Sequence, residues 1–133
     1  MGYTHYWRHS GELPAAGWDQ FRAMALAITD RAQAQRLGLE GVQIDAEVVR
    51  FDGQCETFLV KRVGKGFDFC KTRRDGYDPA VTACLMALKE CFPTMVRVSS
   101  DGYWSDWSPK GVALFQEALG RDPICPLEEV PDE

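Results

Sequence analysis

Apolar and polar positions along the chain change their period several times, and each change marks an expected element. Residues 2–9 alternate, with Tyr3, His5, Trp7 and His9 on one face of an expected strand. A helix is expected over about 18–37, because Trp18, Phe21, Ala25, Ile28 and Ala32 recur at helical spacing. The chain therefore opens with a strand, a short linker containing Gly11 and Pro14, and a helix.

The next segment predicts an antiparallel meander over residues 42–72. The apolar stretch from Val42 to Phe51 ends at Asp52-Gly53, a pair that suits a type I′ hairpin turn. A return strand is expected over 56–63, a second turn at 64–66, and a further strand over 67–72. Three consecutive antiparallel strands are therefore expected here.

Two proline-containing starts predict the remaining helices. Asp78-Pro79 is typical of an N-cap followed by the first helical residue, and Pro93 ends the helix that follows. A short strand is expected over 95–99. Ser108-Pro109 repeats the start signal before a helix that ends at Gly120.

The resulting order is β-α-β-β-β-α-β-α, which predicts an α+β fold. The simplest layering is a single mixed, mainly antiparallel sheet with helices packed on one face. The expected domain covers residues 1–120, and residues 121–133 form an acidic, Pro-rich tail that we expect to be extended and partly mobile.

Composition narrows the function classes. The chain has 133 residues, about one domain, with 15 Lys and Arg against 20 Asp and Glu and a net charge of -5. An acidic molecule repels nucleic acid, so direct nucleic-acid binding is disfavoured. Five cysteines without a CxxC pair argue against a disulfide framework or a zinc ribbon. With no secretory signal and no membrane-spanning run, the expected location is the cytoplasm.

Polar residues at the ends of the expected elements suggest a composite ligand site. A helix N-terminus near Lys71, Arg73 and Arg74 would suit an anion, although Asp78 as a cap would compete for the free N–H groups. The candidate ligand-binding residues are His5, Glu56, Lys71, Thr72, Arg73, Tyr77, Asp78 and Asp101. The alternative reading is an exposed, charged loop with structural turn residues.

Catalysis and metal binding have weaker signals. Cys70 is a candidate nucleophile, because the neighbouring Lys71 could favour its thiolate form. Packing in the core is the simpler role for this cysteine, and no catalytic residue is assigned. The carboxylates match no known metal loop. His5 and His9 would be some 13 Å apart on a strand, so no metal site is expected, and no cofactor is implied.

The segment Tyr103-Trp104-Ser105-Asp106-Trp107 is a candidate partner-binding surface. Tyr103, Trp104 and Trp107 are of the residue types that anchor interfaces. The same residues could instead pack in the core or stack on a ligand, and the sequence leaves these alternatives open.

Several motifs taken together resemble a family of small proteins from phages, prophages and bacteria with no established activity. The shared motifs are GYTHYW at 2–7, FDG at 51–53, CETF at 55–58, FCKTR at 69–73, YD at 77–78 and SSDG at 99–102. The resemblance spans residues 2 to about 119 and carries no catalytic residues over. Asp52 departs from the Asn often found in the family, and Arg74 and Asp75 look particular to this chain.

The resemblance implies a phage or mobile-element setting, in which small acidic proteins often inhibit host defence. The first hypothesis is therefore a non-enzymatic, anti-CRISPR-like protein that contacts a host protein or complex in the host cytoplasm. The second is a binding protein or enzyme for a small anionic ligand, a nucleotide or phosphorylated metabolite, at the composite site.

Overall fold

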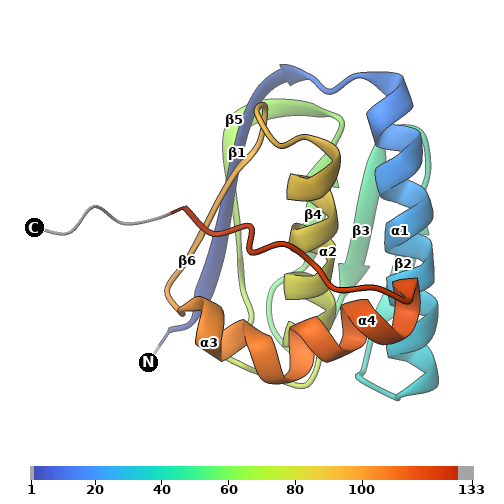
Figure 1. Cartoon of the computed structure of the whole chain (residues 1–133), viewed down its shortest axis with the longest axis vertical. Helices are drawn as coiled ribbons and strands as arrows, with labels where there is room; N and C mark the ends of the chain where they lie inside the picture. Colours follow the sequence, from blue (N-terminus) through green and yellow to red (C-terminus); the bar gives the residue numbers. More distant parts are fainter. Residues whose placement is uncertain (1, 129–133) are drawn as a thin grey trace, which may run out of the picture.

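The computed structural model describes residues 2–128 and confirms the α+β class. In chain order the elements are β1 (Thr4–Glu12), α1 (Ala15–Ala34), β2 (Glu40–Ile44), β3 (Val48–Asp52), β4 (Phe58–Lys61), β5 (Val63–Lys71), α2 (Asp78–Cys91), β6 (Arg97–Ser100), α3 (Trp104–Trp107), the π-helical turn η1 (Ser108–Val112) and α4 (Ala113–Leu119). Figure 1 shows the whole chain, with the helices α1–α4 and the strands β1–β6 labelled.

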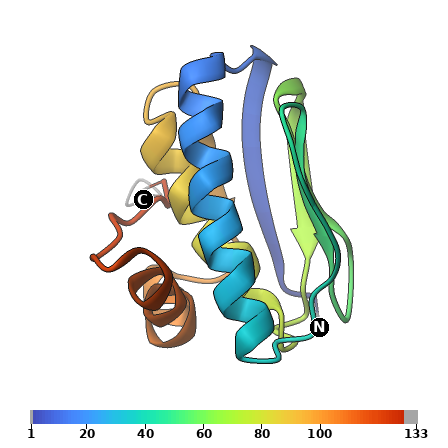
Figure 2. The same cartoon turned by 90° about the vertical axis from the view of Figure 1, so that its right-hand side faces the viewer.

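The strands form two three-stranded antiparallel sheets, where the sequence predicted one. One sheet has the order β5-β1-β6 and the other β2-β3-β4. Successive strands β4 and β5 lie next to each other but form no continuous ladder. In Figure 2, α1 and α2 lie on one side of the strands, and no helix of residues 2–128 lies on the other side.

The core lies between the helices and the inward faces of both sheets. Strand β1 contributes His5, Trp7 and His9, and Tyr3 lies just before it; all four are 6% exposed or less. From α2, the residues 80–88 are buried around the whole helix circumference. An amphipathic surface helix would bury only a stripe, so α2 is the central helix of the domain.

The expected strand over 42–51 is instead the β2–β3 hairpin. Its turn is fixed by Asp45, whose Oδ1 accepts hydrogen bonds from the backbone N–H groups of Glu47 and Val48. The sequence did not predict this turn, because apolar residues flank it on both sides. Its one sequence signal is Asp45, whose side chain can accept hydrogen bonds from nearby backbone N–H groups.

The tight hairpin turn that was expected at Asp52-Gly53 is also absent from the described structure. Strand β3 ends at Asp52 and β4 begins at Phe58, so residues 53–57 form a longer loop. Gly53 does not have a positive φ. A Cβ at this position would lie 2.0 Å from Cδ2 of Tyr77, so glycine is needed here for the close approach of the buried tyrosine ring.

Two more expected boundaries are wrong. The glycines at 64 and 66 lie inside β5 rather than in a turn before it. The last helix begins at Trp104, four residues before Ser108-Pro109, and continues through η1 into α4. Pro109 falls in the π-helical turn, which accommodates a residue that has no N–H to donate. Gly120 ends α4 with φ 72°, as expected.

The C-terminal segment is packed against the domain as far as residue 128. Leu127 forms a parallel bridge with Val98 of β6, and the N–H of Glu128 donates to the Val98 carbonyl. This segment covers the outer edge of β6. The remainder of the predicted tail, residues 129–133, lies outside the described residues.

Candidate functional site

A buried polar network joins β1, β6 and the start of α2. His5 is fully buried; its Nε2 lies 2.7 Å from Oδ1 of Asp78, and its Nδ1 lies 2.7 Å from Oγ of Ser100. The hydroxyl of Thr72 donates to the same Asp78 oxygen at 2.5 Å. Three of the predicted ligand-binding residues, His5, Thr72 and Asp78, are therefore in direct contact.

Asp78 has this role instead of the predicted N-cap role. Tyr77 precedes the helix, and no side chain caps it. The N–H of Asp78 donates to Asp75 O, and those of Ala80 and Val81 both donate to Tyr77 O. Because these N–H groups are already used and Pro79 has none, the start of α2 does not offer the anion site that the sequence suggested.

Ser100 is the second centre of the network. Its Oγ accepts hydrogen bonds from the N–H of Gly102, at 2.9 Å, and from Nε1 of Trp107, at 3.4 Å. The rings of Tyr3 and Trp107 pack edge-on against His5 with centroid distances of 4.9 and 5.0 Å. The imidazole is thus held on all sides by described residues and has no surface of its own.

Asp78 also lines an open cleft, which we call the α2 cleft. The cleft has a volume of about 430 Å³ and lies between the start of α2 and the η1 turn. It is lined by Leu37, Arg74, Asp75, Gly76, Asp78, Pro79, Asp106, Pro109, Lys110 and Gly111. The described residues make no hydrogen bond to Oδ2 of Asp78, so this oxygen remains as an acceptor at the wall of the cleft.

Charges in the α2 cleft are partly compensated. Arg74 lies 3.5 Å from Asp106 and stacks over the Tyr3 ring at 3.9 Å. A hydrogen bond from the N–H of Tyr103, followed by the nearby Arg74, holds the pKa of Asp106 below its ordinary value. None of the ion pairs formed within residues 2–128 includes Lys110.

Unusual backbone surrounds the same cleft. Arg73 and Arg74 both have positive φ, at 55° and 59°, a region that side chains other than Gly, Asn and Asp rarely adopt. The opposite wall contains η1, a π-helical turn of a kind often found at functional sites. Hydrogen bonds from the N–H groups of Thr72 and Arg73 to Tyr3 O hold the loop in place.

Glu56, Lys71 and Tyr77 form a neighbouring contact set with a structural role. The N–H of Lys71 donates to the side-chain Oε1 of Glu56, and the carbonyl of Lys71 accepts the N–H of Glu56. The buried hydroxyl of Tyr77 donates to the carbonyls of both residues. These contacts tie the start of β4 to the end of β5, and none of the three residues lines the α2 cleft.

The remaining predicted ligand residues also serve local structure. Arg73 is paired with Asp75 at 3.0 Å and donates to the carbonyl of Gln54. Asp101 accepts the N–H of Thr4 and the hydroxyl of Tyr6. Both residues border the network without joining it.

Nucleophilic chemistry is disfavoured at the cysteine and tyrosine of this region. Burial raises the pKa of Cys70 to about 12, so the thiol stays protonated near neutral pH. Burial also raises the pKa of Tyr77. Phe67 and Phe69 point outward, and Cys70 points into the core, consistent with a packing role.

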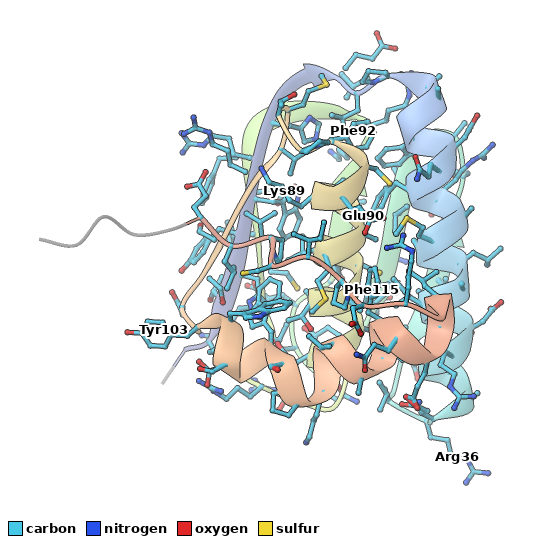
Figure 3. All side chains as sticks on the ribbon, in the orientation of Figure 1. Arg36, Lys89, Glu90, Phe92, Tyr103 and Phe115 are labelled. Carbon is cyan, nitrogen blue, oxygen red and sulfur yellow. The ribbon has the colours of Figure 1, made fainter. Side chains whose placement is uncertain are left out.

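The predicted partner segment is divided between surface and core. Tyr103 is 78% exposed and projects from the molecule in Figure 3, and Trp104 is half-buried. Trp107 is 1% exposed. The prediction that Trp107 presents a partner surface is therefore wrong, because its ring is used to cover His5.

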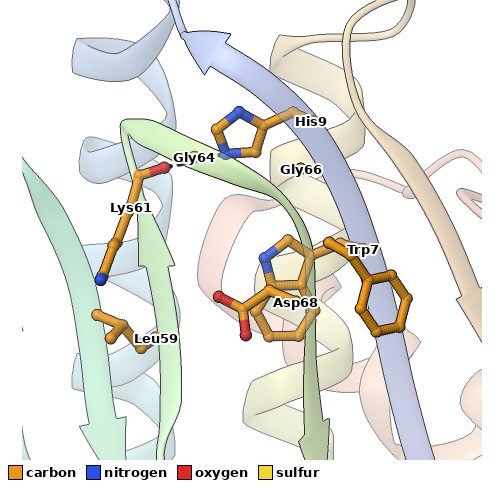
Figure 4. Close-up of a pocket in the computed structure, with 8 residues that line it drawn as sticks. Trp7, His9, Leu59, Lys61, Gly64, Gly66 and Asp68 are labelled. Atoms are coloured by element: carbon orange, nitrogen blue, oxygen red, sulfur yellow. Dashed lines mark hydrogen bonds between the residues drawn. The ribbon is translucent and has the colours of Figure 1, made fainter.

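A second cavity lies in the gap between β4 and β5. It has a volume of about 260 Å³, and Figure 4 shows Trp7, His9 and Asp68 along it. The Nε2 of His9 lies 3.0 Å from Lys61 O, whereas Nδ1, like the buried hydroxyl of Tyr3, has no hydrogen-bond partner among the described side chains. A Cβ on Gly64 would lie 2.4 Å from the His9 ring, so glycine makes room for the imidazole.

The candidate ligand set predicted from the sequence left out four residues of the site. Ser100 was noticed only as part of a turn motif, and Arg74, Asp106 and Lys110 were not selected as ligand residues. The signal for Ser100 was its place in the SSDG motif after a short strand. No periodic pattern connects position 110 with position 78, since their proximity results from how α3 and η1 pack on α2.

Comparisons with protein-family models, curated proteins and solved structures gave no match to this chain. No helix within residues 2–128 is long and apolar enough to span a bilayer. In the same range, no group of three or more His, Cys, Asp or Glu side chains is placed to hold a metal ion.

Proposed function

We propose that the protein is a non-enzymatic binding protein that holds a small anionic ligand, a nucleotide or a phosphorylated metabolite, in the α2 cleft. The observation that carries the proposal is that two residues line the same cleft: Lys110, which is in no ion pair of the described residues, and Asp78, which is fixed by His5 and Thr72. The volume of about 430 Å³ lies within the range of small-molecule sites.

The basic and the acidic residues of the cleft would contact different groups of the ligand. Lys110 and Arg74 would contact the anionic group, since an ammonium and a guanidinium are the usual partners of phosphate. Oδ2 of Asp78 would accept a hydrogen bond from a ligand hydroxyl. Because Oδ1 is already held by two buried donors, the carboxylate would lose little conformational freedom on binding.

Binding is favoured over catalysis because the reactive groups are closed off. His5 is fully buried, and the Cys70 thiol has a raised pKa and is buried as well. A general base must lie within hydrogen-bond reach of its substrate, and His5 is separated from the cleft by Asp78.

A thermal-shift screen with nucleotides and sugar phosphates tests the proposal. A ligand at a hundredfold excess over Kd should stabilise the protein by about 2.7 kcal/mol. We expect Lys110→Gln to remove the shift and Lys61→Gln, which changes an exposed lysine outside the cleft, to retain it. An undiminished shift in Lys110→Gln, or no shift with any compound, would contradict the proposal.

Exposure of Tyr103 favours a second candidate function. Tyr103 and the half-buried Trp104 lie at the start of α3, and exposed aromatic side chains are frequent interface anchors. If the resemblance of the sequence motifs holds, this candidate would act in a phage setting, as an anti-CRISPR-like inhibitor that contacts a host protein in the cytoplasm. Tyr103→Ala would weaken such a contact while leaving a small-ligand shift unchanged, which separates the two functions.

A further inference from the structure

The side of the β5-β1-β6 sheet that faces away from the helices carries a group of exposed aromatic and basic residues. We call it the aromatic face, formed by Tyr6, Arg8, Phe67, Phe69, Lys71 and Arg97. Phe67 and Phe69 are 52% and 49% exposed. Figure 2 shows no helix from the described part of the chain on this side of the strands, in agreement with the exposure of the two phenylalanine rings.

The three rings form a continuous row across two strands. Tyr6 and Phe67 are stacked, with centroids 5.9 Å apart and planes at 26°, and Phe69 follows Phe67 at 6.2 Å and 35°. Tyr6 pairs with Phe69 across the β1–β5 ladder, and Phe67 pairs with Arg8. The ladder therefore fixes the spacing of the rings before any partner arrives.

Unpaired cations lie beside this row. Arg8 stacks over the Phe67 ring at 5.6 Å, and none of the ion pairs within residues 2–128 includes Arg8 or Lys71. Three carboxylates border the face: Asp101 accepts hydrogen bonds from Thr4 and Tyr6, Glu56 accepts the N–H of Lys71, and Glu128 pairs with Arg97 at 3.6 Å. Arg8 and Lys71 are thus cations without an ion-pair partner within residues 2–128, on a protein whose net charge is -5.

From these observations we propose that the aromatic face binds single-stranded nucleic acid, with bases stacked on Phe67, Phe69 and Tyr6 and phosphates against Arg8 and Lys71. Exposed rings on an open antiparallel sheet, flanked by cations, are a stacking platform for unpaired bases. A duplex keeps its bases stacked on one another and cannot use the rings. This site is separate from the α2 cleft and does not depend on the function proposed there.

The net negative charge of the protein opposes the approach of a nucleic acid from a distance but has little effect on a strand already bound at the aromatic face. At physiological ionic strength, charges separated by more than about 8 Å are largely screened. A bound strand therefore experiences mainly Arg8 and Lys71. This predicts weak long-range attraction and an affinity in which base stacking has a large share.

Fluorescence anisotropy with labelled oligo(dT) and oligo(U) tests the proposal, and the two strands distinguish DNA from RNA. We expect Phe67→Ala to weaken binding about 5- to 150-fold, the range for loss of one base-stacking ring. Phe67→Trp should restore binding, because it keeps a ring at this position. Leu26→Ala, a truncation of a similarly exposed residue on α1, should have no effect.

The salt dependence of binding tests the cations independently. Two phosphate contacts to a single strand predict a slope of log K against log salt of about -1.4, and Arg8→Gln should reduce it to about -0.7. Three outcomes would overturn the proposal: absence of binding at low salt, equal binding of duplex and single strand, or unchanged binding by Phe67→Ala. Light scattering can detect a fourth contradicting outcome. If the protein binds neither strand but forms a dimer, and Phe67→Ala disrupts that dimer, the aromatic face is a contact between two copies of the chain.

Discussion

His9 shows how a single side chain can give the whole domain a pH response. The imidazole is 6% exposed and lies in the gap between β4 and β5, where Nε2 faces Lys61 O. Burial lowers its pKa, and this exceeds the opposite effects of the Lys61 carbonyl and of Asp68. In the folded protein the imidazole therefore stays neutral at pH values where an exposed histidine takes up a proton.

The sign of the resulting stability change follows from linkage. When the pH falls below about 6.5, the unfolded chain binds a proton at His9 that the folded chain does not. The free energy of unfolding should then fall, by at most about 1.4 kcal/mol for each pH unit through this residue. Urea unfolding at several pH values should show the fall in the natural protein and a smaller one in His9→Gln. Parallel pH profiles for the two proteins would contradict this assignment.

The sequence did not predict which aromatic residues are buried and which are exposed. Trp107 and Tyr103 belong to one aromatic motif, yet one is 1% exposed and the other 78%. Phe67 and Phe69 belong to an alternating strand in which the aromatic side faces solvent and the side of Cys70 faces the core. Alternation shows which residues share a face, but which face is buried depends on where the helices pack.

At the scale of elements, the junction between β1 and α2 depends on one carboxylate. Asp78 receives hydrogen bonds in the first turn of α2 from Thr72 and from the buried His5 of β1. The sequence predicted the helix start correctly to within a residue, because Asp-Pro is a local signal. The partner of Asp78 lies 73 positions away in the chain and could not be read from a local pattern.

Asp78→Ala should destabilise the protein more than Asp78→Asn. Alanine leaves Nε2 of His5 and the Thr72 hydroxyl without their shared acceptor, at a cost of about 1–3 kcal/mol for an unsatisfied buried group. Asparagine keeps a carbonyl oxygen in the same place and should lose less. Urea unfolding measures both, with Asp30→Ala at an exposed position of α1 as the control. Equal stability of the Ala and Asn variants would show that the network is not needed to hold α2.

At the scale of the molecule, the main difference from expectation is the division of the strands into two sheets. The two sheets share one helical layer and one core, so the α+β class was predictable from the order of the elements. The gap between them was not, because β4 and β5 are separated by one residue and have strand-like composition throughout. His9 lies in this gap beside Lys61, at the end of β4. Glu56 closes the opposite end of the gap by accepting the N–H of Lys71, at the end of β5.

The two-sheet arrangement predicts a specific pattern of amide hydrogen exchange along β5. Lys71 bonds to Glu56 rather than to β1, so by alternation the N–H groups of residues 67, 69 and 71 point toward β4. The amide of Phe69 is satisfied by the Asp68 carboxylate, whereas no ladder between β4 and β5 in the described part of the chain gives the amide of Phe67 a partner. Phe67 should therefore exchange much faster than Cys70, whose N–H points toward β1.

Exchange measured by NMR can separate a permanent gap from a closed sheet. In Asp68→Ala, the Phe69 amide should lose its acceptor and exchange as fast as that of Phe67, while the amide of Cys70 remains protected. If Phe67 is instead as well protected as Cys70, β4 and β5 must be paired in solution, and the cavity between them would not persist. Because closure would also displace the His9 imidazole from Lys61 O, the pH response of stability should then disappear together with the fast exchange.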